Sequence, residues 1–181
     1  TSTPAASLSG DMDEYGRPYA TRGDLVQPIS QMRKAIVRSM TASKFSAPHF
    51  YLTMDVEMDA AAKFRSECNM SITGTKISFN DLVVAAAARA LRSHARVNSA
   101  YTEQGIVEHG DINIGVAVAI DDGLVVPVVR HAEQKTLTAI SQEIRSLGKR
   151  AKNKELRPAE MQGGTFTVSN LGMFGIDEFT A

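Results

Sequence analysis

The stretch Ile112–Ile120 constrains the fold of this chain more than any other feature, because it is apolar on both of its faces. A strand with that pattern has to be covered on both sides, which is typical of a central strand with helices packed over it. Asp121–Gly123 then forms a hairpin-type turn into a second apolar run, Leu124–Val129. Pro127 cannot donate a ladder hydrogen bond, so we expect this second strand to be irregular or to lie at an edge there.

Two strongly patterned helices are predicted to pack on this sheet. After Thr136, apolar residues recur at the helical steps of three and four, at Leu137, Ile140, Ile144 and Leu147. The basic end of that helix is interpreted as a solvated face rather than a phosphate site. Leu82–His94 is rich in alanine, which favours close packing on a sheet, and a capping box of Ser78 and Asp81 precedes it.

The first part of the chain carries three further predicted elements. Gln31–Ser43 has an amphipathic helical pattern with Met32, Ile36 and Met40 on its core face. Phe50–Met58 alternates strictly between apolar and polar residues and predicts a half-buried strand. Asp59 is placed to cap a helix that runs to about Cys68. Strands that alternate with long helices predict an α/β domain.

Composition sets the organisation and excludes several classes of function. A chain of 181 residues suits one domain. Residues 1–24 show no helical or strand period and predict a linker or N-terminal arm, which leaves 25–181 as the domain. The 20 basic and 20 acidic residues cancel, which disfavours nucleic acid as a partner. The longest apolar runs are far shorter than the ~20 residues of a membrane span, so no membrane partner is expected.

The motifs of common catalytic and binding sites are missing. The sequence has no metal-binding cysteine or histidine spacing, no glycine-rich phosphate loop and no GxSxG elbow, so no metal site is expected. Ser169 ends a predicted strand that starts at Thr165 and precedes the glycine-containing loop Asn170–Gly175. A hydroxyl there can be held rigidly at the rim of a sheet. From position alone, however, a serine that merely ends the strand is the more common interpretation.

The histidines do not form a recognisable catalytic group. His49 is the best placed of them, next to the predicted strand at Phe50–Met58, whereas His94 ends a helix and His109 and His131 lie in turns. A structural or surface role is favoured for each of the four.

Several segments together resemble the catalytic domain of the 2-oxo acid dehydrogenase acyltransferases, the core subunits of 2-oxo acid dehydrogenase complexes. They are Met32–Ile36, Pro48–Tyr51, Ser78–Asp81, Gly123–Arg130 and Gly163–Gly175. The likeness covers about residues 25–181, and the letters SNLGMFG in the last segment resemble the acetyl-transferring branch. The resemblance implies an α/β fold like that of chloramphenicol acetyltransferase, a mixed sheet with packed helices.

The resemblance also implies an activity and a role for Ser169. Members of the family transfer an acyl group from a dihydrolipoyl arm to coenzyme A, and a histidine deprotonates the incoming thiol. The residue that matches Ser169 donates a hydrogen bond to the tetrahedral oxyanion. Coenzyme A is then a substrate, and the lipoyl group sits on a separate domain. The resemblance leaves the residues that bind coenzyme A unassigned.

One departure from the family pattern concerns the base. The family histidine belongs to an HxxxDG motif some fifty residues beyond the serine, and none of the four histidines of this sequence is followed by that pattern. We therefore expect these 181 residues to be an incomplete catalytic domain, truncated at its C-terminus and inactive by itself. The alternative is a non-catalytic structural or docking subunit of the same core. A third interpretation is an acetyltransferase that acts on a small alcohol, as other members of this fold do.

The partners implied by the resemblance are those of a multienzyme core. The family forms homotrimers that assemble further, and it works with lipoyl domains and with decarboxylase and dihydrolipoamide dehydrogenase subunits. The expected setting is the bacterial cytoplasm or the mitochondrial matrix.

Overall fold

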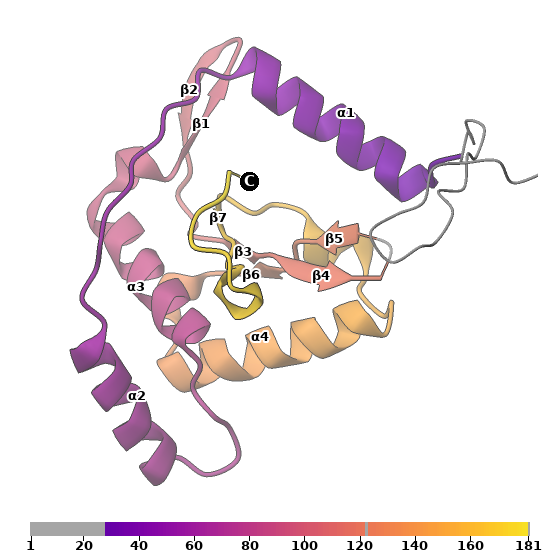
Figure 1. Cartoon of the computed structure of the whole chain (residues 1–181). Coiled ribbons are helices and arrows are strands. Elements are labelled where there is room, and N and C mark those ends of the chain that lie inside the picture. Colours follow the sequence, from indigo (N-terminus) through magenta and orange to yellow (C-terminus); the bar gives the residue numbers. More distant parts are fainter. Residues whose placement is uncertain (1–27, 122, 181) are drawn as a thin grey trace, which may run out of the picture.

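The computed structural model describes residues 28–121 and 123–180, so the linker predicted at residues 1–24 lies outside the described part (Figure 1). The α-helices are α1 (Gln31–Ser46), α2 (Asp59–Ser71), α3 (Phe79–Ser93) and α4 (Leu137–Lys152). The strands are β1 (Ser99–Thr102), β2 (Gly105–Glu108), β3 (Ile114–Val116), β4 (Val118–Ile120), β5 (Gly123–Val125), β6 (Val128–Val129) and β7 (Phe166–Val168). Short 3-10 turns, η1 to η4, span Ala95–Val97, Ala132–Gln134, Pro158–Met161 and Gly172–Phe174.

A mixed sheet of three strands lies at the centre, in the order β6-β3-β7. Strand β3 is antiparallel to β6 and parallel to β7, and all three of its residues are buried. The central strand expected from the apolar run Ile112–Ile120 is therefore confirmed. The run is nevertheless two strands, because β3 ends at Val116 and β4 begins a separate hairpin with β5 after Ala117.

Pro127 divides the second apolar run, as expected. Strand β5 ends at Val125 and β6 begins only at Val128. Pro127 lies between them, is fully buried, and its carbonyl accepts a hydrogen bond of 2.9 Å from the Val116 N–H. A proline ring removes one donor but leaves the acceptor, so the chain can bend here and still bond to β3.

Helices α3 and α4 pack against each other and form the hydrophobic core with the sheet. The buried side chains at the centre are Val84, Leu91, Ile114, Val129 and Ile140, each at most 4% exposed. Helix α3 begins with the predicted capping box: the Asp81 N–H donates to the Ser78 Oγ at 3.1 Å, and the Ser78 N–H donates to Asp81 Oδ2 at 2.7 Å. Thr136 caps α4 in a similar way, through the Ala139 N–H.

The first part of the chain departs from the sequence-based expectations. Helix α1 forms, but no residue in it is buried, and its predicted core methionines Met32 and Met40 are exposed. The segment Phe50–Met58 is extended but unpaired, and Leu52 is 80% exposed. A strand needs a neighbouring edge, and among the described strands none pairs with this segment. Instead, it runs along one side of the molecule from α1 to α2 (Figure 1).

Helix α2 differs from its prediction in one detail of capping. Met58, not Asp59, occupies the N-cap position and makes no side-chain capping bond, while Asp59 is the first helical residue. A carboxylate in the first turn still interacts favourably with the helix dipole. Among the described helices, none is long and apolar enough to cross a bilayer.

Candidate functional site

Ser169 follows directly on β7 and lines a hollow of about 280 Å³. Three sides of the hollow come from the β3–β4 segment, the C-terminal half of α4 and the loop after β7. The walls are mainly apolar, and the polar lining side chains besides Ser169 are those of Asn80, Lys152 and Asn170. Ser169 itself is half-buried. The serine predicted at the rim of a sheet therefore lies in a concave site.

Parallel pairing of β7 with β3 places Ser169 in this hollow. The register sets Ile114 opposite Phe166 and Val116 opposite Val168, and the Ala117 N–H continues the ladder with a 3.1 Å bond to the Val168 carbonyl. Ser169 is thus the first residue beyond the ladder. The sheet anchors the backbone that precedes Ser169, and the chain leaves the sheet after it.

The loop that follows Ser169 is held in a defined turn. The Asn170 side-chain oxygen accepts a 2.9 Å hydrogen bond from the Gly172 N–H. The Phe174 N–H donates to the Leu171 carbonyl at 2.9 Å, and Gly175 takes a φ of +71°, a conformation that glycine adopts without strain. The loop therefore carries its own hydrogen bonds, which helps to fix the Ser169 hydroxyl relative to the hollow.

The hollow is suited to stabilising negative charge on a substrate oxygen. A hydroxyl donor in a largely apolar site interacts more strongly with a developing anion than the same donor in water does. Among the described residues, none forms a hydrogen bond with the Ser169 hydroxyl, so it is available to a substrate. Lys152 is the cationic residue among those that line the hollow.

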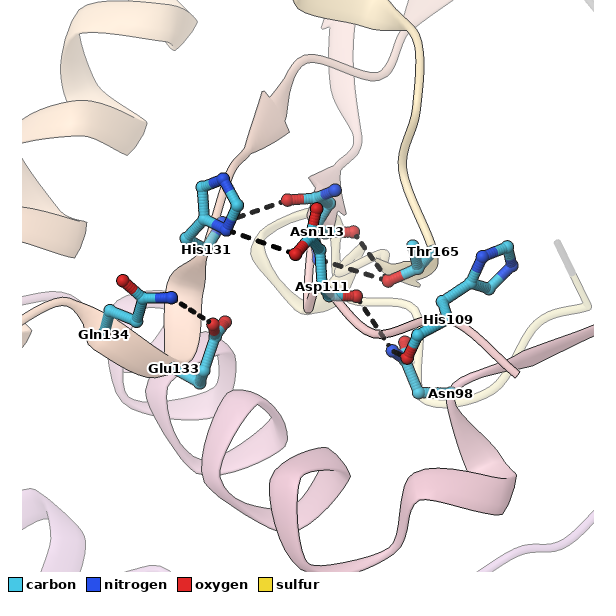
Figure 2. A network of polar contacts seen from close by, with 8 residues as sticks. All are labelled: Asn98, His109, Asp111, Asn113, His131, Glu133, Gln134 and Thr165. Carbon is cyan, nitrogen blue, oxygen red and sulfur yellow. Dashed lines mark hydrogen bonds and ion pairs between the residues drawn. The ribbon is translucent and has the colours of Figure 1, made fainter. Parts of the chain in front are cut away.

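The structure brings none of the four histidines into this hollow. His49 is exposed, with Nδ1 2.8 Å from the Ala47 carbonyl, and its ring stacks on Tyr51. His94 is the C-cap of α3. His109 and His131 lie in the separate polar network drawn in Figure 2, where His131 Nδ1 is 3.7 Å from Asp111 Oδ1. A structural or surface role stays the prediction for each of the four histidines.

That polar network joins the start of β3 to its neighbours, and sequence reasoning did not identify it. Asn98 is buried and donates from Nδ2 to the carbonyls of His109 and Asp111, at 3.0 and 2.9 Å (Figure 2). Asn113 and Thr165 bond to each other in the same network. The signal available in the sequence was a polar residue, Asn113, inside the apolar run Ile112–Ile120.

The basic end of α4 is more than the solvated face that its composition suggested. The Arg150 guanidinium binds both carboxylate oxygens of Glu160, at 2.7 and 2.9 Å. These hydrogen bonds from Arg150, followed by those from Arg157, lower the pKa of Glu160 from 4.5 to about 2. Arg145 donates to the Lys76 carbonyl at 2.6 Å. These cations tie α4 to its surroundings. Among the described residues, no group of histidine, cysteine and acidic side chains could hold a metal ion.

Comparisons with known proteins agree with this architecture. The family model for the 2-oxoacid dehydrogenases acyltransferase (catalytic domain) matches residues 21–181. The dihydrolipoyllysine-residue acetyltransferase component of the pyruvate dehydrogenase complex from Rhizobium meliloti is 44% identical over 160 residues, which are 85% of this chain and 36% of that protein. The chain thus spans about a third of the length of this curated relative. Related acetyltransferase components come from bacteria and from mitochondria.

Solved structures give the same result for the fold. A probable dihydrolipoamide acetyltransferase from Listeria monocytogenes superimposes with a TM-score of 0.82 at 34% identity, covering 88% of this chain and 69% of that one. The cubic core of a pyruvate dehydrogenase multienzyme complex gives a TM-score of 0.83 at 26% identity, covering 100% and 72%. The mixed sheet with packed helices that the family resemblance implied, the chloramphenicol-acetyltransferase-like fold, is confirmed.

Proposed function

The chain belongs to the family of 2-oxo acid dehydrogenase acyltransferase catalytic domains, and from that premise we propose that its parent protein transfers an acetyl group from dihydrolipoamide to coenzyme A. The observation that carries the proposal is the family match over residues 21–181, which includes the whole sheet and the hollow around Ser169. Coenzyme A is the acyl acceptor in this proposal, and the donor is a lipoyl group on a separate domain.

Ser169 is proposed to stabilise the tetrahedral intermediate of this transfer. The thiolate of coenzyme A attacks the thioester carbonyl, and the carbonyl oxygen becomes an oxyanion before the bond to the dihydrolipoyl sulfur breaks. A preorganised hydroxyl donor at that oxygen is worth on the order of 3–4 kcal/mol of transition-state stabilisation. The available hydroxyl, the apolar walls and the hydrogen-bonded loop after Ser169 support this role.

A general base is the second requirement, because a thiol with a pKa of ~8.5 is mostly protonated at neutral pH. None of the four histidines lines the hollow, and none belongs to an HxxxDG motif. We therefore assign the base to a histidine outside these 181 residues, in the rest of the parent chain or in a neighbouring subunit. Within this scheme, residues 25–181 are the incomplete catalytic domain and residues 1–24 are a linker.

Assembly into a larger core is part of the same proposal. The structural relative from a cubic pyruvate dehydrogenase core supports a multimeric arrangement, and we propose homotrimers as its unit. Lipoyl domains, a decarboxylase and a dihydrolipoamide dehydrogenase are the proposed functional partners. The bacterial and mitochondrial relatives favour the bacterial cytoplasm or the mitochondrial matrix as the setting.

The test is an acetyl-transfer assay on the full-length parent protein. Acetyl-dihydrolipoamide and coenzyme A are supplied, and acetyl-coenzyme A is measured, with a panel of small alcohols tested separately as acceptors from acetyl-coenzyme A. The proposal predicts transfer to coenzyme A and none to the alcohols. A full-length protein that assembles into trimers but transfers nothing would be a structural or docking subunit, and transfer to an alcohol alone would make it an antibiotic-type acetyltransferase.

A further inference from the structure

We propose that Thr165 and Asn113 are positioning residues for the proposed acyl transfer, because together they fix the register of β7 on β3 and so the place of Ser169. This inference rests on the proposed function of Ser169. It concerns how the fold holds that serine, and neither residue lines the hollow.

The register of β7 needs additional contacts because the strand is short and lies at the edge of its sheet. It has three residues, and among the described strands it pairs only with β3. A slip of one residue along β3 would move Ser169 by ~3.3 Å and turn its side chain to the opposite face. Ser169 would then leave the hollow.

Asn113 and Thr165 bind each other immediately before the ladder begins. The Thr165 N–H donates to the Asn113 carbonyl at 2.8 Å, and the Asn113 N–H donates to the Thr165 Oγ1 at 3.1 Å. The second bond uses a side-chain hydroxyl, so it can form only when residue 165 stands opposite residue 113. Asn113 is 7% exposed, so a lost acceptor there leaves its N–H poorly compensated by water.

The same asparagine also joins the third strand. The Asn113 Oδ1 accepts a 3.0 Å hydrogen bond from the His131 N–H, at the end of β6 (Figure 2). The segment before β7 is held independently, since Arg130 Nη2 donates to the carbonyls of Ala159 and Gln162, both at 2.9 Å. Side chains therefore fix the sheet at the end where β7 begins, and β7 runs from there to Ser169.

The first experiment compares Thr165→Val with Thr165→Ser in the full-length protein, assayed for acetyl transfer. Valine has nearly the shape of threonine but cannot accept from the Asn113 N–H, whereas serine keeps the acceptor. Misplacing a catalytic group by about 1 Å can cost on the order of 100-fold in rate, so we expect Thr165→Val to lower kcat by roughly 10-fold or more with little change in KM. Thr165→Ser should restore kcat to within about threefold of the parent.

A double-variant cycle separates this role from general destabilisation. If Thr165 acts through Ser169, Thr165→Val added to Ser169→Ala should cause no further loss. Equal losses in both backgrounds, or a Thr165→Val protein with the parent kcat, would overturn the inference. If Ser169→Ala alone leaves kcat unchanged, the proposed role of Ser169 fails instead. Should Thr165→Val not fold, Thr165→Ala replaces it. The smaller side chain leaves room for water at the Asn113 N–H, which favours folding, and the same losses of kcat are expected.

Discussion

Two regions of this chain carry equally regular apolar patterns, but the patterned residues are buried in one region and exposed in the other. In the sheet region, formed by β3, β6 and β7 with α3 and α4, the patterned residues are buried, and Ile114 is 0% exposed. In the leading region, formed by α1 and the segment Phe50–Met58, they are exposed, and Leu52 is 80% exposed. Periodicity therefore identifies which residues share a face, but burial depends on whether another element covers that face.

The two regions also differ in the hollows that they line. Ser169 lies in the sheet region, where backbone ladders and packed helices make a site rigid. The leading region instead lines a hollow of about 540 Å³ with residues 177–180, bridged by a long bond of 3.5 Å from Thr53 Oγ1 to Glu178 Oε1.

Truncating one side chain in each region should give the largest difference. Ile140→Ala removes a side chain that is 1% exposed and should lower the free energy of unfolding by about 2–5 kcal/mol, through lost burial and the cavity left behind. Leu52→Ala should change it by less than about 0.5 kcal/mol. Chemical denaturation measures both. An equal loss of unfolding free energy in Leu52→Ala would contradict this difference between the two regions. It would mean that another chain buries the segment.

A methyl group added to glycine tests how tightly the sheet region is packed. A Cβ at Gly115 would lie 2.7 Å from Val126 Cγ1 and 3.3 Å from Thr167 Oγ1, so Gly115→Ala should cost about 1–3 kcal/mol. The control is Gly148→Ala in α4, where nothing lies within 4 Å, and which should stabilise the helix by about 0.5–1 kcal/mol. Thermal unfolding distinguishes the two. A neutral Gly115→Ala would show that β3 and its surroundings can move apart.

The N-caps of α3 and α1 differ in the same way as the regions to which they belong. Ser78 caps the packed helix α3, and Ser30 caps the exposed helix α1 through a 3.2 Å bond from the Arg33 N–H. Ser78→Ala should lower the global stability by about 1 kcal/mol. Ser30→Ala should reduce only the helicity of α1, because fraying an exposed helix uncovers little buried surface. Hydrogen exchange resolves both effects, and protection lost across the core in Ser30→Ala would contradict this expectation.

The smallest expected effect is on the free energy of unfolding at acid pH. Hydrogen bonds from Arg150, and then from Arg157, lower the pKa of Glu160 to about 2 in the folded chain. These contacts therefore stabilise the fold fully above the ordinary pKa of 4.5 and lose their effect as pH falls toward 2. Glu160→Gln should make the free energy of unfolding less dependent on pH within that window. Chemical denaturation of the parent and of Glu160→Gln at a series of acid pH values measures this. If the two chains show the same pH dependence, the Arg150–Glu160 pair does not stabilise the folded state in solution.

The sequence predicted those parts of the structure whose signals are local. The capping box at Ser78, the helix after Thr136 and the break at Pro127 each depend on a few neighbouring residues, and the structure confirms all three. Strand β1, by contrast, was not predicted, since Ser99–Thr102 has no apolar alternation and becomes a strand by pairing with β2.

The candidate site was predictable only in part, for the same reason. The end of β7 and the following turn placed Ser169 at a sheet rim, but its hollow depends on α4 and on the β3–β4 segment, which are distant in sequence. The bond between Asn113 and Thr165 joins residues 52 positions apart, and no periodic pattern signals it. Long-range polar contacts become visible only once the strands are paired.

The proposed role of Ser169 is tested directly by the kcat of Ser169→Ala for acetyl transfer to coenzyme A in the full-length protein. Ser93→Ala is the matched control, because that serine is exposed at the end of α3 and its hydroxyl donates to the Arg89 carbonyl of its own helix, at 3.4 Å. We expect kcat to fall by roughly 100-fold or more in Ser169→Ala and to stay unchanged in Ser93→Ala. A Ser169→Ala enzyme with a kcat within about threefold of the parent would contradict it.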